Sequence, residues 1–114
     1  MTMDTMFLEV LWNRLVSIVD EQAAALMPAS FTTVVREAGD LSAGVFDTQG
    51  RMLAQAVTGT PGHINTMANC VQELVRTWPI ERLKQGDSLV TNDPWMCAGH
   101  LHDIIVITPV FYRG

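Results

Sequence analysis

One short stretch of the chain, residues 92–103, gathers most of the side chains that could bind a metal or move a proton. It holds two of the three histidines in the sequence, two carboxylates and one of the two cysteines. Apolar residues flank it, with Ser88-Leu89-Val90 before it and Ile104-Ile105-Val106-Ile107 after it. Pro94 lacks an N–H and disfavours helix at the residue before it. The pattern predicts a polar loop of fixed shape between two strands, a common support for a reacting site.

The side chains of His100, His102 and Asp103 are of the types that bind divalent metal ions in proteins. A third ligand must come from elsewhere, and His63 is the only other histidine. Two histidines and one carboxylate would leave coordination positions open for water or substrate. From spacing alone, His102 can replace His100 as the ligand. A loop whose histidines only cap strands and turns fits the same pattern.

Other reactive side chains have simpler interpretations beside their functional ones. Cys97 would be a nucleophile if a nearby histidine served as its base, and the simpler interpretation is a packed thiol. Asp93 most simply forms an Asx turn before Pro94, and the alternative is contact with a substrate. A charged cluster earlier in the chain is either a solvated turn or faces a site; its members are Arg36, Glu37 and Asp40.

A long amphipathic helix is predicted over residues 5–27, with Asp4 as its N-cap and Pro28 marking its end. Apolar residues recur there at three- and four-residue steps, which predicts one buried face formed by Leu8, Leu11, Trp12, Leu15, Ile18, Val19, Gln22 and Leu26. Residues 31–38 fit a short helix that ends at Gly39.

The rest of the chain alternates between strands and a helix. Strands are expected at 41–46 and 52–57, joined by a hairpin turn in which Gly50 has a positive φ. A helix follows over residues 64–78, with an apolar face formed by Met67, Cys70, Val71, Leu74, Val75 and Trp78. Further strands are expected at 88–91 and 104–111. These elements predict an α+β fold with the strands in a mixed sheet.

Composition excludes several classes of function. The net charge is −5, and the seven Lys and Arg residues form no basic stripe, which argues against nucleic-acid binding. No apolar run approaches the roughly 20 residues of a membrane span. Two cysteines without a C-x-x-C spacing favour reduced thiols in a cytoplasmic protein. Because the chain ends just after a predicted strand, we expect a fragment of a larger subunit.

Short motifs along nearly the whole chain occur in an order that is similar to a known family. They are Leu11-Trp12-Asn13-Arg14-Leu15, Asp40-Leu41-Ser42-Ala43-Gly44-Val45-Phe46-Asp47, Gly50-Arg51-Met52-Leu53-Ala54-Gln55, Pro61-Gly62-His63-Ile64, Asn92-Asp93-Pro94, Gly99-His100-Leu101 with Asp103, and Thr108-Pro109-Val110-Phe111. On these residues the chain resembles the N-terminal region of the hydantoinase B/5-oxoprolinase family. That family comprises the B-type subunits of ATP-dependent hydantoinases, oxoprolinases and acetone-type carboxylases. Residues 1–114 would be the N-terminal part of such a domain. Many family members carry tyrosine where this chain has Trp95, and proline where it has His102.

The resemblance implies ATP-dependent hydrolysis of a cyclic amide, such as a hydantoin or 5-oxoproline, or a related carboxylation. It implies a divalent metal ion, manganese or zinc, held by His63, His100 and Asp103. Asp93 and His102 are then the candidates for catalytic roles beside the metal.

Partners follow from the same resemblance. The sequence has no glycine-rich phosphate loop, so ATP with magnesium is expected on an A-type partner subunit, in a hetero-oligomer that acts on a small molecule. The 114 residues alone are expected to be inactive. The alternative is a non-catalytic binding or assembly module whose histidine loop is structural.

Overall fold

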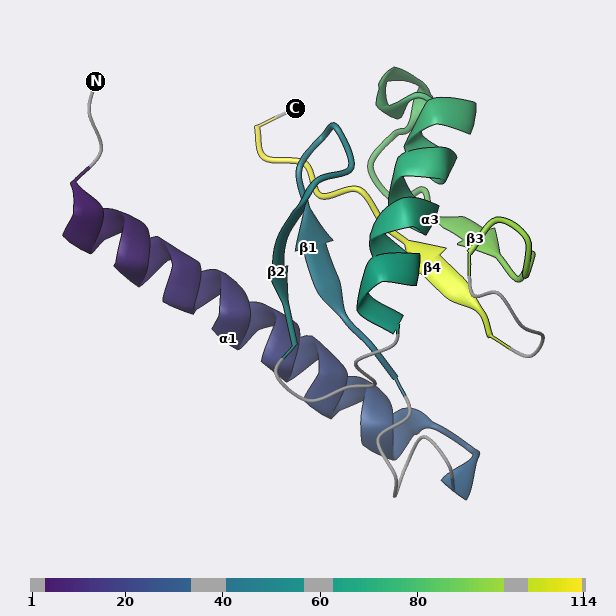
Figure 1. Cartoon of the computed structure of the whole chain (residues 1–114), viewed down its shortest axis with the longest axis horizontal. Helices are drawn as coiled ribbons and strands as arrows, with labels where there is room; N and C mark the ends of the chain where they lie inside the picture. Colours follow the sequence, from purple (N-terminus) through teal and green to yellow (C-terminus); the bar gives the residue numbers. More distant parts are fainter. Residues whose placement is uncertain (1–3, 34–40, 57–62, 98–102, 114) are drawn as a thin grey trace. The chain divides into compact units, whose positions relative to one another are not determined.

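A computed structural model describes residues 4–33, 41–56, 63–97 and 103–113 of the chain, with residues 63–65 described by their backbone alone. The chain divides into two compact units. The first comprises residues 1–47 and 52–64, and the second comprises residues 48–51 and 65–114. Figure 1 labels the helices and strands of both units.

The first unit begins with helix α1, Thr5–Ala29, close to the predicted range. Asp4 is its N-cap, as predicted, and the carboxylate oxygen Oδ1 accepts the backbone N–H of Met6 at 3.1 Å. Pro28 does not end the helix but lies inside its last turn. The helix closes where the Ser30 N–H donates to the Met27 carbonyl oxygen at 3.2 Å.

The predicted hairpin is confirmed as strands β1, Gly44–Phe46, and β2, Met52–Gln55, which pair antiparallel. Gly44 lies opposite Gln55, and the register becomes irregular after Val45. The turn between the strands contains Gly50, whose φ of 82° is the left-handed conformation that the turn was expected to need.

One face of the hairpin packs against α1 and forms the core of the first unit (Figure 1). The buried residues of this core are Val19, Ala23, Leu41, Ala43 and Ala54. The predicted buried face of α1 was too broad: Leu8, Leu11 and Trp12 are 46%, 42% and 56% exposed. Ala23, which the pattern passed over, is fully buried because a small side chain lets the hairpin approach the helix closely.

The second unit contains helix α3, His63–Thr77, from its third residue onward. It also contains a 3-10 turn η1, Ile80–Arg82, and strands β3, Leu89–Thr91, and β4, Ile105–Ile107. Its core joins α3 to the strands through Cys70, Leu74, Cys97, Leu89, Met96, Ile105 and Ile107. The predicted apolar face of α3 is confirmed at Cys70, Val71 and Leu74. Trp78, assigned to the same face, is instead 46% exposed beyond the end of the helix.

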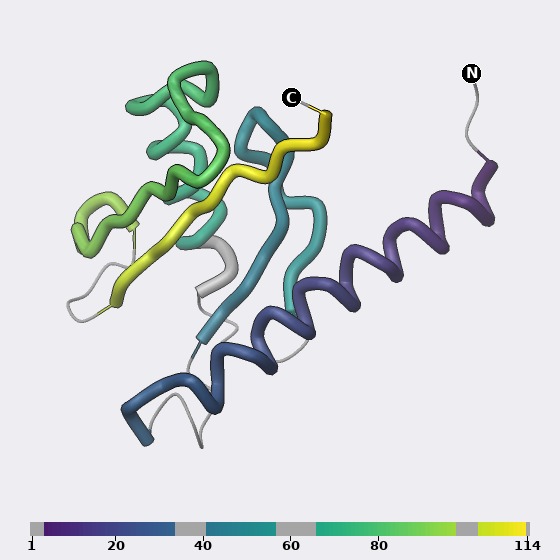
Figure 2. The backbone as a smooth tube through the Cα atoms, turned by 180° about the vertical axis from the view of Figure 1, so that it is seen from behind, coloured from purple at the N-terminus to yellow at the C-terminus, as the bar shows by residue number. Residues whose placement is uncertain are grey.

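The expected mixed sheet is wrong for the described strands, which form two separate antiparallel pairs, β1 with β2 and β3 with β4. Figure 2 shows the chain of β4 beside that of β3, and Leu89 lies opposite Ile107. The last strand was predicted to reach residue 111 but ends at Ile107. Beyond it the partner strand has ended, and Pro109 has no N–H to donate to a ladder.

Two expectations concern segments with little or no description. The short helix over 31–38 falls mostly outside the described residues, as do Arg36, Glu37 and Asp40 of the charged cluster.

Among the helices that the structure describes, none is long and apolar enough to span a membrane.

Candidate functional site

The first half of the ligand-rich loop is held by Asp93, which forms the predicted Asx turn. Its carboxylate oxygen Oδ1 accepts the backbone N–H of Trp95 at 2.9 Å. The Asp93 N–H in turn donates to the hydroxyl oxygen of Thr91 at 3.2 Å, and the Cys97 N–H donates to the Asp93 carbonyl oxygen at 3.2 Å. These bonds give the loop a defined shape directly after β3.

A disulfide joins Cys97, at the end of this turn, to Cys70 in the middle of α3. The expectation of separate reduced thiols is therefore wrong for this structure. Helix α3 packs against the loop at this point. The Cα atoms of Cys70 and Cys97 lie 4.6 Å apart, within the usual range for a disulfide. Cys97 is thus no free nucleophile here. Its side chain is buried, as the simpler interpretation predicted, but as half of a disulfide and not as a packed thiol.

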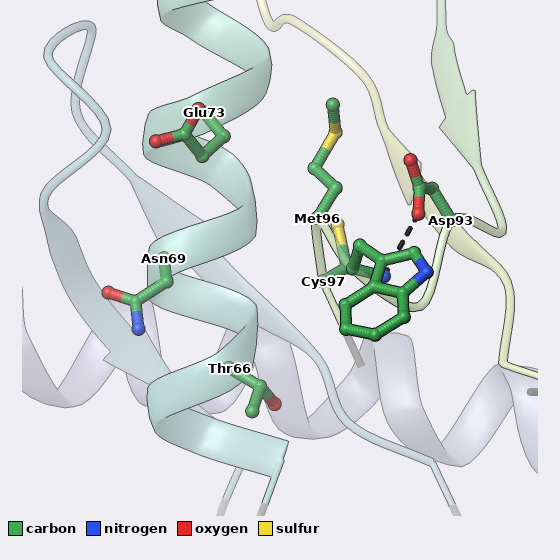
Figure 3. A pocket seen from close by; sticks show the side chains of 7 residues that line it. Thr66, Asn69, Glu73, Asp93, Met96 and Cys97 are labelled. Carbon is green, nitrogen blue, oxygen red and sulfur yellow. Dashed lines mark hydrogen bonds between the residues drawn. The ribbon is translucent and has the colours of Figure 1, made fainter. Parts of the chain in front are cut away.

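An open cavity of about 550 Å³ lies between α3 and this loop, within the second unit. Figure 3 shows Thr66, Asn69 and Glu73 on successive turns of α3, and Asp93, Met96 and Cys97 on the loop. Trp95, the remaining lining residue, is 97% exposed. Glu73 forms an ion pair with Arg76, one turn further along α3. Hydroxyl, amide and carboxylate groups beside an indole ring suit hydrogen bonding to a small polar molecule.

The predicted metal ligands are only partly described. His100 and His102 lie outside the described residues, and His63 is placed only as the first residue of α3. Asp103 lies half-buried just before β4, as expected for a residue at the start of a strand. Within the described part of the chain, no three His, Cys, Asp or Glu side chains are grouped to hold a metal ion. The convergence of His63, His100 and Asp103 stays a prediction.

Two polar residues of the hairpin, Ser42 and Gln55, received no role from the sequence. The Ser42 hydroxyl oxygen and the Gln55 side-chain carbonyl oxygen are buried, and neither has a hydrogen-bond partner among the described residues. Both lie inside the motifs on which the family resemblance rests. The available signal was a single polar residue within each of two otherwise apolar segments, residues 41–46 and 52–57.

Comparison with known proteins gives a match over almost the whole chain. The family model described as hydantoinase B/oxoprolinase matches residues 4–114. No solved structure matches the chain.

Individual relatives agree with that match. Over 97% of this chain, 35% of residues are identical to 5-oxoprolinase 1 of Arabidopsis thaliana, and over 95% of it, 35% are identical to 5-oxoprolinase of Saccharomyces cerevisiae. A candidate B-type subunit of a D-/L-hydantoinase from a Pseudomonas species is 26% identical over 96% of the chain. The chain spans 9%, 8% and 19% of the lengths of these three relatives.

Proposed function

Because the chain belongs to the hydantoinase B/oxoprolinase family, we propose that it takes part in ATP-dependent hydrolysis of a cyclic amide of the hydantoin or 5-oxoproline type, or in a related carboxylation. The observation that carries this proposal is the 35% identity to 5-oxoprolinase 1 of Arabidopsis thaliana over 97% of the chain. Since the chain spans 9% of that relative, the activity belongs to a longer protein of which these residues form part.

His63, His100 and Asp103 are the residues we propose to hold a divalent metal ion, manganese or zinc. The donor set fits, since two imidazoles and one carboxylate suit either ion and leave positions for water or substrate. When bound, the ion would act as a Lewis acid that polarises the amide carbonyl of the substrate. The half-buried position of Asp103 next to β4 supports this role, because a ligand at a strand end moves little.

Asp93 and His102 are the residues that we propose to act beside the metal. One carboxylate oxygen of Asp93 is engaged by the Trp95 N–H, and the side chain also lines the cavity along α3. Its carboxylate can therefore orient a substrate N–H or a water while the turn keeps it in place. His102 is suited to proton transfer, because the pKa of an ordinary imidazole is close to neutral pH.

ATP handling is proposed for an A-type partner subunit, with which this protein would form a hetero-oligomer. The support is that the sequence contains no glycine-rich phosphate loop. We propose a cytoplasmic location. The Cys70–Cys97 disulfide would then be an exception to the reduced state that most cytoplasmic thiols keep.

The proposal is tested on the complete protein with its A-type partner by following ATP consumption in the presence of 5-oxoproline or hydantoin. His100→Ala should remove bound metal, measured by mass spectrometry of the eluted ions, together with activity. His102→Ala is the matched control and should retain the metal while slowing turnover. Equal metal content in wild type and His100→Ala would favour the alternative, a non-catalytic binding or assembly module with a structural histidine loop.

A further inference from the structure

The two unpaired polar atoms of the β1–β2 hairpin point to a ligand. They are the hydroxyl oxygen Oγ of Ser42 and the side-chain oxygen Oε1 of Gln55, both shielded from solvent and without a partner among the described residues. Such a group destabilises the folded state, because its hydrogen bonds to water are lost and not replaced. Binding or catalysis is one of the few reasons for which proteins keep unpaired polar groups.

The strand register places both side chains on the same face of the hairpin. Gln55 lies opposite Gly44, and paired residues of antiparallel strands share a face. The ladder continues beyond the strands, since the Ala56 N–H donates to the Ala43 carbonyl oxygen at 2.9 Å. Ser42 precedes Gly44 by two residues of extended chain, so it shares the face of Gly44 and therefore of Gln55.

This face is the one that does not pack on helix α1. The alternate residues Ala43, Val45 and Ala54 point the other way, into the core of the first unit. Gly44 has no side chain, so no side chain stands directly opposite Gln55 on this face. The core face of the hairpin is thus apolar at Ala43, Val45 and Ala54, whereas its opposite face carries a hydroxyl donor and a carbonyl acceptor.

We propose that Ser42 and Gln55 bind the amide edge of a cyclic-amide substrate. The Ser42 hydroxyl donates to the ring carbonyl oxygen, and Gln55 Oε1 accepts the ring N–H. A small ring holds its amide in the cis form, so the N–H and C=O point to one side and can meet a donor and an acceptor together. This inference rests on the proposed function and adds residues that select the substrate.

The pairing distinguishes the cyclic amide from other small molecules. A ketone offers an acceptor but no N–H, which would leave Gln55 Oε1 unpaired. A carboxylate has only acceptors, and the Gln55 oxygen would repel it. A site that leaves a buried polar group unpaired rejects the wrong ligand strongly, so the hairpin favours cyclic amides with a free ring N–H.

The test measures binding to the complete protein by titration calorimetry without ATP, so that no turnover occurs. The probes are 5-oxoproline, hydantoin and N-methylated 5-oxoproline, which lacks the ring N–H. Ser42→Ala and Gln55→Leu should each weaken binding of the first two probes about fivefold to tenfold. Wild type should bind the N-methylated probe more weakly, and Gln55→Leu should not weaken that binding further.

Thermal unfolding of the ligand-free variants separates a binding role from a structural one. Both variants should unfold at the same or a higher temperature than wild type, because each removes an unpaired buried polar group. Ser88→Ala is the control: its hydroxyl is already bonded to the Thr108 hydroxyl at 2.8 Å, and its loss should leave ligand binding unchanged.

Three outcomes would overturn the inference. Unchanged binding in both variants would do so while leaving the proposed function intact if the wild type still turns over substrate. A lower unfolding temperature in Ser42→Ala would show that the hydroxyl has a structural partner instead. A wild type that binds neither 5-oxoproline nor hydantoin would remove the proposed function, and this inference with it.

Discussion

The Cα atoms of Cys70 and Cys97 lie 4.6 Å apart, and their disulfide fixes the middle of α3 to the loop that leads to His100. Both side chains are buried, at 0% and 8% exposure. The bond therefore lies in the core of the second unit, beneath one wall of the cavity between α3 and the loop. The disulfide therefore anchors the described part of the loop, up to Cys97, to the middle of α3.

Loss of the disulfide should loosen the second unit. A crosslink that closes a loop of 27 residues stabilises the fold by about 3–4 kcal/mol in the chain-entropy model. In Cys97→Ala, amide hydrogen exchange along α3 should be faster than in wild type. Adding reductant to wild type should raise its exchange rate close to that of the variant. Alkylation of both cysteines in denatured, unreduced protein would contradict the bond.

Gly50→Ala should destabilise the hairpin turn more than Gly86→Ala destabilises its own turn. Both glycines have positive φ, 82° and 96°, which costs any other residue about 1 kcal/mol or more. A Cβ on Gly50 would also lie 3.1 Å from Cγ and 3.2 Å from Cα of Gln72, whereas one on Gly86 meets nothing within 4 Å. Hydrogen exchange near each turn measures the difference, and equal effects would argue against the close packing of Gly50 on α3.

Asp93 should respond differently to two substitutions. Asp93→Asn keeps a side-chain oxygen that can accept the Trp95 N–H, so the loop should retain its shape while the charge is lost. Asp93→Ala loses both, and the Trp95 amide should exchange faster by the equivalent of about 1 kcal/mol. If the carboxylate acts in catalysis, kcat of the complete protein should fall in both variants. Full activity in Asp93→Asn would assign the residue to the turn alone.

Val19→Ala should weaken the packing of α1 on the hairpin. Val19 is 0% exposed, so removing two carbon atoms costs about 2 kcal/mol through lost burial and the cavity left behind. Val10→Ala, on the same helix at 56% exposure, should change stability by about 0.5 kcal/mol or less. Amide exchange in α1 and β2 compares the two, and an equal loss would place Val10 in contact with a surface beyond the described residues.

Features set by neighbouring residues were predictable from the sequence. Asp4 as a cap, Gly50 in the hairpin turn, the Asx turn at Asp93 and the buried Cys70-Val71-Leu74 face of α3 each depend on chemistry within a few positions. The local pattern of β-branched residues likewise located β3 and the start of β4.

Features set by distant pairing were not predictable in the same way. Nothing local to Cys70 indicates that Cys97 will lie against it, and no short pattern decides whether four strands join one sheet or form two pairs. Apolar residues surround much of α1, so spacing could not single out Val19 and Ala23. For the site, the sequence named the loop and Asp93, whereas Ser42 and Gln55 became candidates only through their burial.

The crosslink from Cys70 to Cys97 also changes what a cut in the chain would do. The exposed Lys84 lies inside the closed loop, in a turn where its N–H bonds Asp87 Oδ2 at 2.8 Å. Trypsin acting after Lys84 would break the polypeptide without separating it, since the two products remain tied through sulfur. On a denaturing gel the nicked protein would run as one band, and two would emerge only after reductant is added.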